Sequence, residues 1–364
     1  MVRAWKRRCG RLAVLGLWMS ITAAVIPAAA DDIGMWRTVI DPAGHQVSVP
    51  TPVKRVACLT GACYEKVFLL GQADKIVSRV ATFPPWMVQT NIKAKDIPTS
   101  PNPNAEDLVK QRVQVAFSFD RPQQLAALAA AGITAVVPAA PVAGEDGTDD
   151  EATFTQAVRR EVRFYGAVLG AEATAEAWCA DYDRRLGYVA ERIATVPIKD
   201  RPRVYYLRGP DALTTHGRDS NMRWYGEMAG GDMGLARRAS PGITRLSMEE
   251  VVQWNPQVIF VGRQYATDLV TKDPRWQDID AVKNGRVYTI PDGVFFWDSS
   301  SEGILLLEFM AKILHPALFP DLNLANETKD YYATFYHYTL SDGEVANLLR
   351  GNGPDGRRSN PAGN

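Results

Sequence analysis

The stretch Asn104-Ala105-Glu106-Asp107-Leu108-Val109, followed by Val113-Gln114-Val115-Ala116-Phe117, has a counterpart later in the chain. The counterpart is Ser247-Met248-Glu249-Glu250-Val251-Val252, followed by Pro256-Gln257-Val258-Ile259-Phe260. Each copy predicts a helix that begins with a capping residue and acidic side chains and that leads into a buried strand. Because the two copies lie in different halves of the chain, they predict two lobes of similar build.

Short apolar runs alternate with helical segments around both copies. In the first half we expect strands over 55–59, 75–80, 113–119 and 133–137, and helices over 64–70, 105–110 and 122–131. In the second half we expect strands over 203–207, 257–261 and 287–290, and helices over 221–229, 248–253 and 301–314. A β-hairpin is expected over 38–49, where two β-rich runs flank turn residues. This βαβ alternation predicts an α/β fold with mainly parallel sheets.

A long helical segment separates the two halves. Residues 172–196 contain no proline and one glycine, Gly187, and their apolar side chains recur at spacings of three and four. At ~1.5 Å per residue this helix would be roughly 37 Å long, enough to act as a strut between lobes. We therefore expect an N-terminal lobe over 31–165, an inter-lobe backbone helix within 166–198 and a C-terminal lobe over 199–340. The Gly-, Asn-, Asp- and Pro-rich residues 341–364 predict a disordered tail.

The first thirty residues have the order of a secretory signal peptide. Five basic and no acidic residues occur in 1–30, an apolar run covers 12–26, and Ala28-Ala29-Ala30 supplies small residues for cleavage. We therefore expect the mature protein in the periplasm, with no stable membrane insertion. The whole chain has 41 basic and 41 acidic residues, so the part after residue 30 is mildly acidic. This charge argues against nucleic acid as a partner.

Three cysteines follow the predicted cleavage site. They are Cys58, Cys63 and Cys179. We expect a monomer, in which an odd number of cysteines leaves at least one thiol unpaired. Cys58 and Cys63 are close enough in sequence to form a disulfide, although the sequence leaves their pairing open.

Motifs for catalysis are lacking in this sequence. It contains no Gly-x-Ser-x-Gly elbow, phosphate loop, dinucleotide fingerprint or His-Glu-x-x-His, and its four histidines are scattered. We therefore expect neither an enzyme nor a resident cofactor or protein-bound metal.

Aromatic and basic side chains instead gather just after the predicted strands. Ligands of open α/β sheets bind outside the carboxyl ends of the strands, where such side chains supply flat contact surfaces and donors for oxyanions. The expected ligand is bulky, partly planar and partly anionic, and Tyr64 or His216 could also ligate a haem or metal directly. The candidate ligand-binding residues are Tyr64, Arg79, Trp86, Arg121, Arg208, His216, Trp224, Arg263, Tyr265 and Trp297.

Several segments in order resemble one known family. They are Asp41-Pro42-Ala43-Gly44-His45-Gln46-Val47-Ser48-Val49-Pro50, Lys54-Arg55-Val56, Gly71-Gln72-Ala73-Asp74-Lys75-Ile76-Val77, the two Glu-bearing stretches and Asn284-Gly285-Arg286-Val287-Tyr288. From about residue 38 to 320 the chain is similar to periplasmic binding proteins for iron-siderophores, haem and cobalamin, which serve ABC importers. The resemblance implies two Rossmann-like lobes joined by a rigid backbone helix, with the ligand in the cleft between them. It also implies a permease-docking glutamate on each lobe, at Glu106 and Glu249, with Glu250 as the alternative to Glu249.

The identity of the ligand stays open at this level. The aromatic residues favour a metal chelate over a bare ion, because a bare iron ion needs clustered carboxylates, tyrosinates and histidines. We expect a ferric siderophore first, haem or a corrinoid second, and a nickel or other metal chelate third. Other possible classes are a secreted enzyme acting on a metal chelate and a secreted sensor.

Overall fold

The first parallel sheet is built from four short, largely buried strands. In the computed structural model, which describes residues 35–80, 84–99, 104–138 and 151–358, they pair in the order β4-β3-β5-β6, and all neighbouring strands are parallel. The strands are β3 (Val56–Cys58), β4 (Ile76–Arg79), β5 (Val115–Phe117) and β6 (Thr134–Val136). All four fall within the ranges expected from the sequence.

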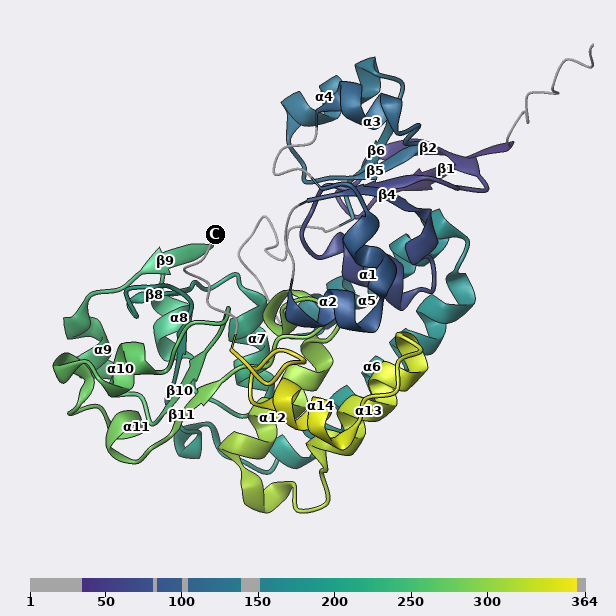
Figure 1. Ribbon diagram of the computed structural model, residues 1–364. Helices are drawn as coiled ribbons and strands as arrows, with labels where there is room; N and C mark the ends of the chain where they lie inside the picture. The colour runs from purple at the N-terminus through teal and green to yellow at the C-terminus, as the bar shows by residue number, and fades with distance from the viewer. Residues whose placement is uncertain (1–34, 81–83, 100–103, 139–150, 359–364) are drawn as a thin grey trace, which may run out of the picture. The chain divides into compact units, whose positions relative to one another are not determined.

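The second parallel sheet has three strands in the order β11-β10-β7. They are β7 (Val204–Leu207), β10 (Val258–Val261) and β11 (Val287–Thr289). Two antiparallel pairs accompany the parallel sheets, as Figure 1 shows. These are β1 (Met35–Ile40) with β2 (Gln46–Thr51), which is the predicted hairpin, and β8 (Thr214–His216) with β9 (Ile243–Arg245). The structure therefore confirms the α/β class with mainly parallel sheets.

Helices surround both sheets. We refer to the elements from β1 to β6 as the N-terminal lobe and to those from β7 to β11 as the C-terminal lobe. The helices are α1 (Cys63–Leu69), α2 (Pro85–Thr90), α3 (Ala105–Lys110), α4 (Pro122–Ala130), α5 (Glu151–Leu169), α6 (Glu172–Ile193), α7 (Asn221–Met228), α8 (Gly234–Arg238), α9 (Met248–Trp254), α10 (Asp268–Thr271), α11 (Asp280–Lys283), α12 (Gly303–Leu314), α13 (Leu324–Phe335) and α14 (Asp342–Leu349).

The repeated stretch forms the same substructure in each lobe. Asn104 caps α3 by accepting a hydrogen bond from the backbone N–H of Asp107, and Ser247 caps α9 through the backbone N–H of Glu250. Each helix leads into a strand that is central in its sheet, β5 in the N-terminal lobe and β10 in the C-terminal lobe. The prediction of two lobes with this unit in common is thus supported.

The connection between the lobes contains two long helices rather than one. The segment expected over 172–196 is α6, but it is preceded by α5, which the sequence reasoning did not identify. Helix α5 contacts α1 of the N-terminal lobe and α7 of the C-terminal lobe, whereas α6 packs on α5, α7 and α12. Gly170, with φ of +70°, makes the turn between them. The predicted helix is therefore one of a pair that joins the lobes, because α6 packs on α7 and its Glu172 lies 3.5 Å from Arg37 of β1.

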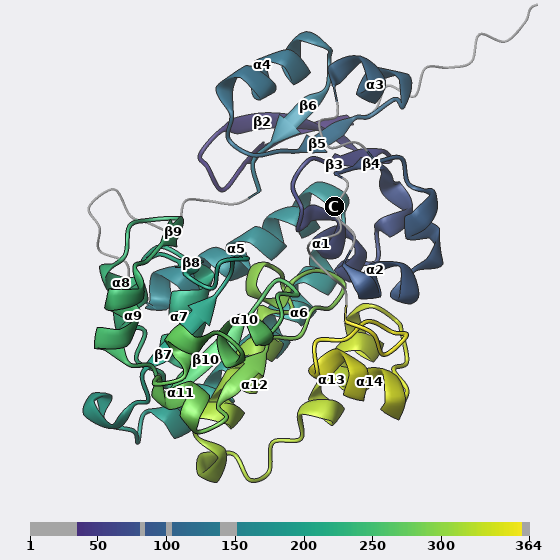
Figure 2. The ribbon, with the colours of Figure 1, turned by 60° about the vertical axis from the view of Figure 1, so that its left-hand side comes forward.

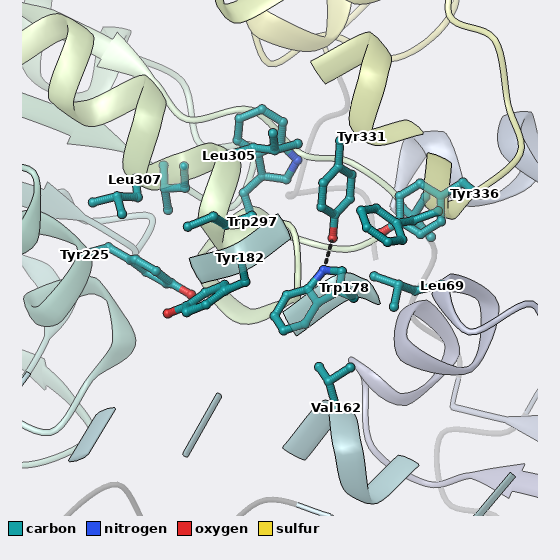
Figure 3. Close-up of a cluster of buried hydrophobic side chains, with 14 of the residues drawn as sticks. Leu69, Val162, Trp178, Tyr182, Tyr225, Trp297, Leu305, Leu307, Tyr331 and Tyr336 are labelled. Carbon is teal, nitrogen blue, oxygen red and sulfur yellow. Dashed lines mark hydrogen bonds between the residues drawn. The ribbon is translucent and has the colours of Figure 1, made fainter. Parts of the chain in front are cut away.

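The core around α6 is rich in aromatic side chains. Figure 3 shows Trp178 and Tyr182 of α6 beside Tyr331 of α13 and Tyr225 of α7. The indole N–H of Trp178 donates a hydrogen bond of 2.9 Å to the hydroxyl of Tyr331. Buried aromatics contribute large apolar areas, and a satisfied N–H avoids the cost of an unpaired buried donor. This core attaches the C-terminal helices to the inter-lobe connection.

The segment predicted as a disordered tail is folded up to Arg358. Helix α14 is capped by Ser341, which forms a reciprocal capping box with Glu344, and it packs on α13. Figure 2 shows these two helices side by side in yellow. Val345 and Leu348 are buried, and burial of this apolar face stabilises a helix whose composition alone indicates disorder. The prediction was therefore wrong for residues 341–358.

The structure also shows which cysteines form a disulfide. Cys58 and Cys63 form a disulfide, and Cys179 is a buried free thiol.

The predicted signal peptide lies outside the described residues. Among the described residues, no helix combines the length and apolar character needed to cross a membrane.

Candidate ligand-binding site

A cavity of about 540 Å³ lies where the carboxyl ends of strands from both lobes meet. This is the position at which ligands of parallel α/β sheets bind. The N-terminal lobe and α5 supply most of the wall, and α7 and two loops of the C-terminal lobe supply the rest. The lining residues are Ala43, Thr60, Gly61, Ala62, Lys66, Ser118, Phe119, Asp120, Val137, Pro138, Glu161, Asn221, Arg263, Phe295 and Ser299.

The loop after β3 forms one wall and also contacts the opposite lobe. Its residues Thr60, Gly61 and Ala62 lie between the two disulfide-bonded cysteines. A Cβ atom on Gly61 would be 2.8 Å from the Phe295 ring, so only glycine allows this approach between lobes. The disulfide closes the loop into a small ring, which limits how far this wall can move.

Lys66 is the cation on the N-terminal side of the cavity. It lies on α1, and its side chain is only 5% exposed. Its Nζ lies 3.5 Å from Oε1 of Glu161 on α5 and 3.9 Å from Oε2 of the fully buried Glu65. Lys66 is therefore held beside acidic groups but reaches the cavity surface.

Arg263 is the cation on the C-terminal side. It follows β10 and has a φ of +55°, an uncommon backbone conformation for a residue other than glycine. Its guanidinium contacts both carboxylate oxygens of Asp298, with Nε donating at 2.9 Å to Oδ2 and a terminal nitrogen 2.8 Å from Oδ1. It also donates to the hydroxyl of Ser299. These contacts hold the guanidinium in one orientation at the cavity wall.

A cluster of basic groups surrounds the same carboxylate. The Nε2 atom of His216 lies 3.7 Å from Oδ2 of Asp298, and Tyr206 donates a 2.5 Å hydrogen bond to that oxygen. Burial would raise the pKa of Asp298, but Arg263 and His216 hold this pKa well below its usual range. Burial lowers the pKa of His216, and burial followed by the charge of Arg263 lowers the pKa of Arg208. The structure thus brings together three predicted site residues, Arg208, His216 and Arg263.

Two helices begin at the cavity. Gly61 and Ala62 immediately precede α1, and Asn221 is the first residue of α7. The N-terminal end of a helix carries a partial positive charge that favours anions. Lys66 and Arg263 add basic groups to the same cavity, whose lining also contains the carboxylates of Asp120 and Glu161.

Four of the predicted ligand residues lie in the core instead. Tyr64, Arg79, Trp86 and Trp297 are each at most 1% exposed. The Tyr64 hydroxyl accepts a hydrogen bond from Asn91, Arg79 donates to the carbonyls of Val80 and Ala94, and Trp86 donates to the carbonyl of Asn352. Large side chains near a sheet fill the space between layers of secondary structure, which explains why these four are buried in the core.

Three further predicted residues do not line the cavity. Arg121 has its guanidinium 4.9 Å from the centroid of the Phe119 ring, so it contacts the site indirectly. Trp224 is buried and stacks on Phe154. Tyr265 is half-buried, and its carbonyl accepts a hydrogen bond from Arg358.

Sequence reasoning missed most of the polar lining. Lys66 and Glu161 lie in helices, and no local pattern marks a helical Lys or Glu as facing a cavity. The loop residues Thr60 and Ser118 could have been found by a rule that assigns to the site every residue directly after a buried parallel strand. Phe119, which is 49% exposed, follows the same rule.

A buried network of carboxylates joins the lobes behind the cavity. Glu65 on α1 accepts hydrogen bonds from the backbone N–H of Ser301 at 3.2 Å and from the hydroxyl of Tyr336 at 2.8 Å. Glu302, before α12, accepts from Tyr332 at 2.6 Å and from the backbone N–H groups of Val294 and Phe295.

Both carboxyls of this network have shifted pKa values. Burial, followed by the neighbouring Glu65, raises the pKa of Glu302 to about 8. Burial also raises the pKa of Glu65, against the attraction of Lys66. Because Phe295 is part of the cavity wall, the network links that wall to the inter-lobe contact.

The described residues contain no group of three or more His, Cys, Asp or Glu side chains placed to hold a metal ion.

The two predicted docking glutamates lie at the surface. Glu106 is in the first turn of α3, where its carboxylate lies 3.0 Å from Nζ of Lys110, and its side chain is 79% exposed. Glu249 is exposed in the first turn of α9. The neighbouring Glu250 is engaged in the capping box with Ser247, which favours Glu249 over Glu250 as the residue free to meet a partner.

Two lobes with parallel sheets, joined by long helices around a cavity, define a two-lobed α/β binding protein. The family model for periplasmic binding proteins matches residues 56–294. The chain belongs to this periplasmic binding protein family.

Individual proteins and solved structures are similar to parts or most of this chain. The molybdate-binding protein MolA of Haemophilus influenzae is 28% identical over 208 residues, which cover 55% of this chain and 57% of that protein. The crystal structure of a periplasmic solute binding protein from Veillonella parvula is 25% identical and has a TM-score of 0.71, covering 87% of this chain and 97% of the other. The structure of MolA with bound molybdate has a TM-score of 0.75 at 22% identity and covers 84% of this chain and 99% of the other.

Proposed function

We propose that this chain is the extracytoplasmic binding component of an ABC importer, which captures a small anionic metal chelate and delivers it to a permease. A ferric siderophore is the first candidate, followed by haem, a corrinoid or a nickel chelate. The observation that carries the proposal is the cavity between the lobes, with Lys66 and Arg263 on opposite sides and two helix N-termini at its edge. Its volume of about 540 Å³ fits a chelate-sized molecule.

The chemistry of the lining supports a chelate over a bare cation. The described residues offer no clustered metal ligands, whereas basic groups and helix N-termini attract the anionic groups of a chelator. Phe119 and Phe295 add flat apolar surface for the planar parts of such a ligand.

A second candidate is a tetrahedral oxyanion such as molybdate. The same basic groups and helix ends suit a small oxyanion, and the relative MolA is named for molybdate. A molybdate ion would fill only part of the cavity, so the volume favours the chelate.

A ligand titration tests the proposal. Purified mature protein is titrated by calorimetry with a ferric tris-catecholate, a ferric hydroxamate, haemin, cyanocobalamin, nickel–histidine and sodium molybdate. We expect binding of a ferric chelate and none of the corresponding iron-free chelator. Exclusive binding of molybdate would replace the first candidate with the second, and binding of none of the six would refute the cavity assignment.

A pair of lysine variants tests the position of the site. Lys66→Met removes the cavity cation, and we expect affinity for the bound ligand to fall about tenfold or more. Lys75→Met is the matched control, because Lys75 is half-buried and donates to the carbonyl of Leu169 away from the cavity. Equal affinity losses in the two variants would contradict the site.

We also propose that Glu106 and Glu249 dock the protein on arginines of the permease. Their exposure and their equivalent places on α3 and α9 support this role. The double variant Glu106→Gln/Glu249→Gln should lose transport while ligand affinity is unchanged. Glu191→Gln, an exposed carboxylate on α6, is the control. Unchanged transport in the double variant would count against docking through these residues.

A further inference from the structure

Helices α3 and α9, which carry the proposed docking glutamates, also have the same pattern of side-chain exposure. Over residues 104–110 and 247–253 the exposure of the side chains follows the same order, position by position. The one fully buried member is Leu108 in α3 and Val251 in α9, and both are 0% exposed. The two helices therefore present the same face to solvent.

Each exposed face includes a valine one turn after the glutamate. Val109 is 48% exposed and Val252 is 53% exposed. Residues three apart on a helix are neighbours, so Val109 lies beside Glu106 and Val252 beside Glu249. A single exposed valine needs no explanation. The same exposed valine at the same position of two equivalent helices indicates a common contact.

We infer that each glutamate and its valine form one two-part docking contact, Glu106 with Val109 and Glu249 with Val252. The inference rests on the proposed delivery to a permease. The partner is then a permease with two matching sites, each with a basic side chain next to an apolar one, as expected of two equivalent subunits. The acidic part steers the encounter and is screened by salt, whereas the apolar part resists salt.

The two contacts differ in the charge of the residue that follows the valine. In α3, Lys110 lies 3.0 Å from Glu106 and competes with any basic group of the partner. The equivalent position in α9 is Gln253, which carries no charge. The α9 contact is therefore the stronger of the two, and removing the charge of Lys110 strengthens the α3 contact.

Serine variants measure the apolar part. The probe is the importer complex, with permease and ATPase subunits reconstituted in lipid nanodiscs, and binding is measured at low and high salt. We expect Val109→Ser/Val252→Ser to weaken the complex about tenfold at both salt concentrations. The matched control is Ile92→Ser/Ile198→Ser, because these isoleucines are 61% and 77% exposed but lie outside α3 and α9. The control should bind within about twofold of the unaltered protein.

Charge variants complete the experiment. Glu106→Gln/Glu249→Gln should weaken binding mainly at low salt, and Lys110→Gln should tighten it about threefold. All variants are on the surface, and unchanged melting temperatures and ligand titrations confirm intact folds.

Two results would overturn the inference. If the valine pair binds like the isoleucine pair while the glutamate pair loses binding, the apolar contact is absent but docking through the acids stands. If the glutamate pair also binds like the unaltered protein, the docking role itself fails and the two-part contact with it.

Discussion

The buried carboxyl of Glu302 should make the stability of this protein fall as the pH rises from 6 to 9. Its pKa in the folded protein is about 8, compared with 4.5 for an ordinary glutamate. The folded state therefore holds a proton that the unfolded state has already released. Stability from such a group is fully present below pH 4.5 and is lost as pH rises through 8.

The size of the effect follows from the two pKa values. At pH 6 the folded carboxyl is two pH units below its pKa, whereas the unfolded one is ionised. At about 1.36 kcal/mol per unit, the contribution at pH 6 is about 3 kcal/mol, and it is nearly gone at pH 9. Glu302→Gln removes this proton exchange.

The assay is urea unfolding of the wild type and of Glu302→Gln at intervals from pH 6 to 9. Buried Asp292 and Glu308, whose pKa values burial raises to about 8 and 7, contribute in the same direction to both proteins. The difference between the two proteins therefore reports Glu302 together with its interaction with the neighbouring Glu65. We expect the wild type to lose about 3 kcal/mol more than the variant over this range. Glu191→Gln, at the surface, should parallel the wild type.

Parallel curves for the wild type and Glu302→Gln would refute the reasoning. They would mean that the three donors from Tyr332, Val294 and Phe295 keep the carboxylate ionised despite burial. A second variant guards against misfolding of the first. Tyr332→Phe removes one donor to the carboxylate, so it should move the loss of stability to higher pH.

Three other predictions concern the cavity loop, the cavity wall and the C-terminal segment. Replacing Cys58 and Cys63 by alanine should lower the free energy of unfolding by about 2 kcal/mol, as estimated for closing so short a loop; an unchanged urea midpoint would contradict this. Phe119→Ala should weaken ferric chelate binding about tenfold without changing the melting temperature, because its ring is half exposed at the cavity; calorimetry that shows equal affinity would exclude contact with the ligand. Trp86→Phe removes the 3.1 Å hydrogen bond to the carbonyl of Asn352, so trypsin should cleave after Arg357 faster than in the wild type; equal cleavage rates would show that this bond does not retain the segment.

The sequence allowed good prediction of the strands and of the helices beside them. All seven strands of the two parallel sheets lie within the expected ranges, because short apolar runs between helical segments have few alternative structures. Helices α3 and α9 were also predicted, since capping residues and acidic first turns are local signals.

Helices α5 and α14 were missed for different reasons. Helix α5 does carry a local signal, because its buried residues Phe154, Val162, Tyr165 and Leu169 recur at helical spacing. Helix α14 has a composition typical of disorder, yet it is ordered by packing on α13. Tertiary burial outweighed local composition in α14, whereas in α5 local periodicity and tertiary burial agree.

The candidate site was predicted in location but only partly in its residues. Arg208, His216 and Arg263 converge on Asp298 as the strand-end rule implies, although only Arg263 lines the cavity. Trp86 and Trp297 follow the same rule but are buried, because sequence position does not say toward which side of a loop a bulky side chain turns.

The sequence by itself determined the α/β class, the repeated helix–strand unit and the acidic starts of α3 and α9. These features depend on periodicity and on capping, which act over a few neighbouring residues. Only the tertiary structure decided that Lys66, Glu161 and Arg263 share one cavity and that Glu65 and Glu302 are buried together. Their burial and electrostatic partners come from segments far apart in the chain, and the environment that sets their charge exists only after both lobes have folded.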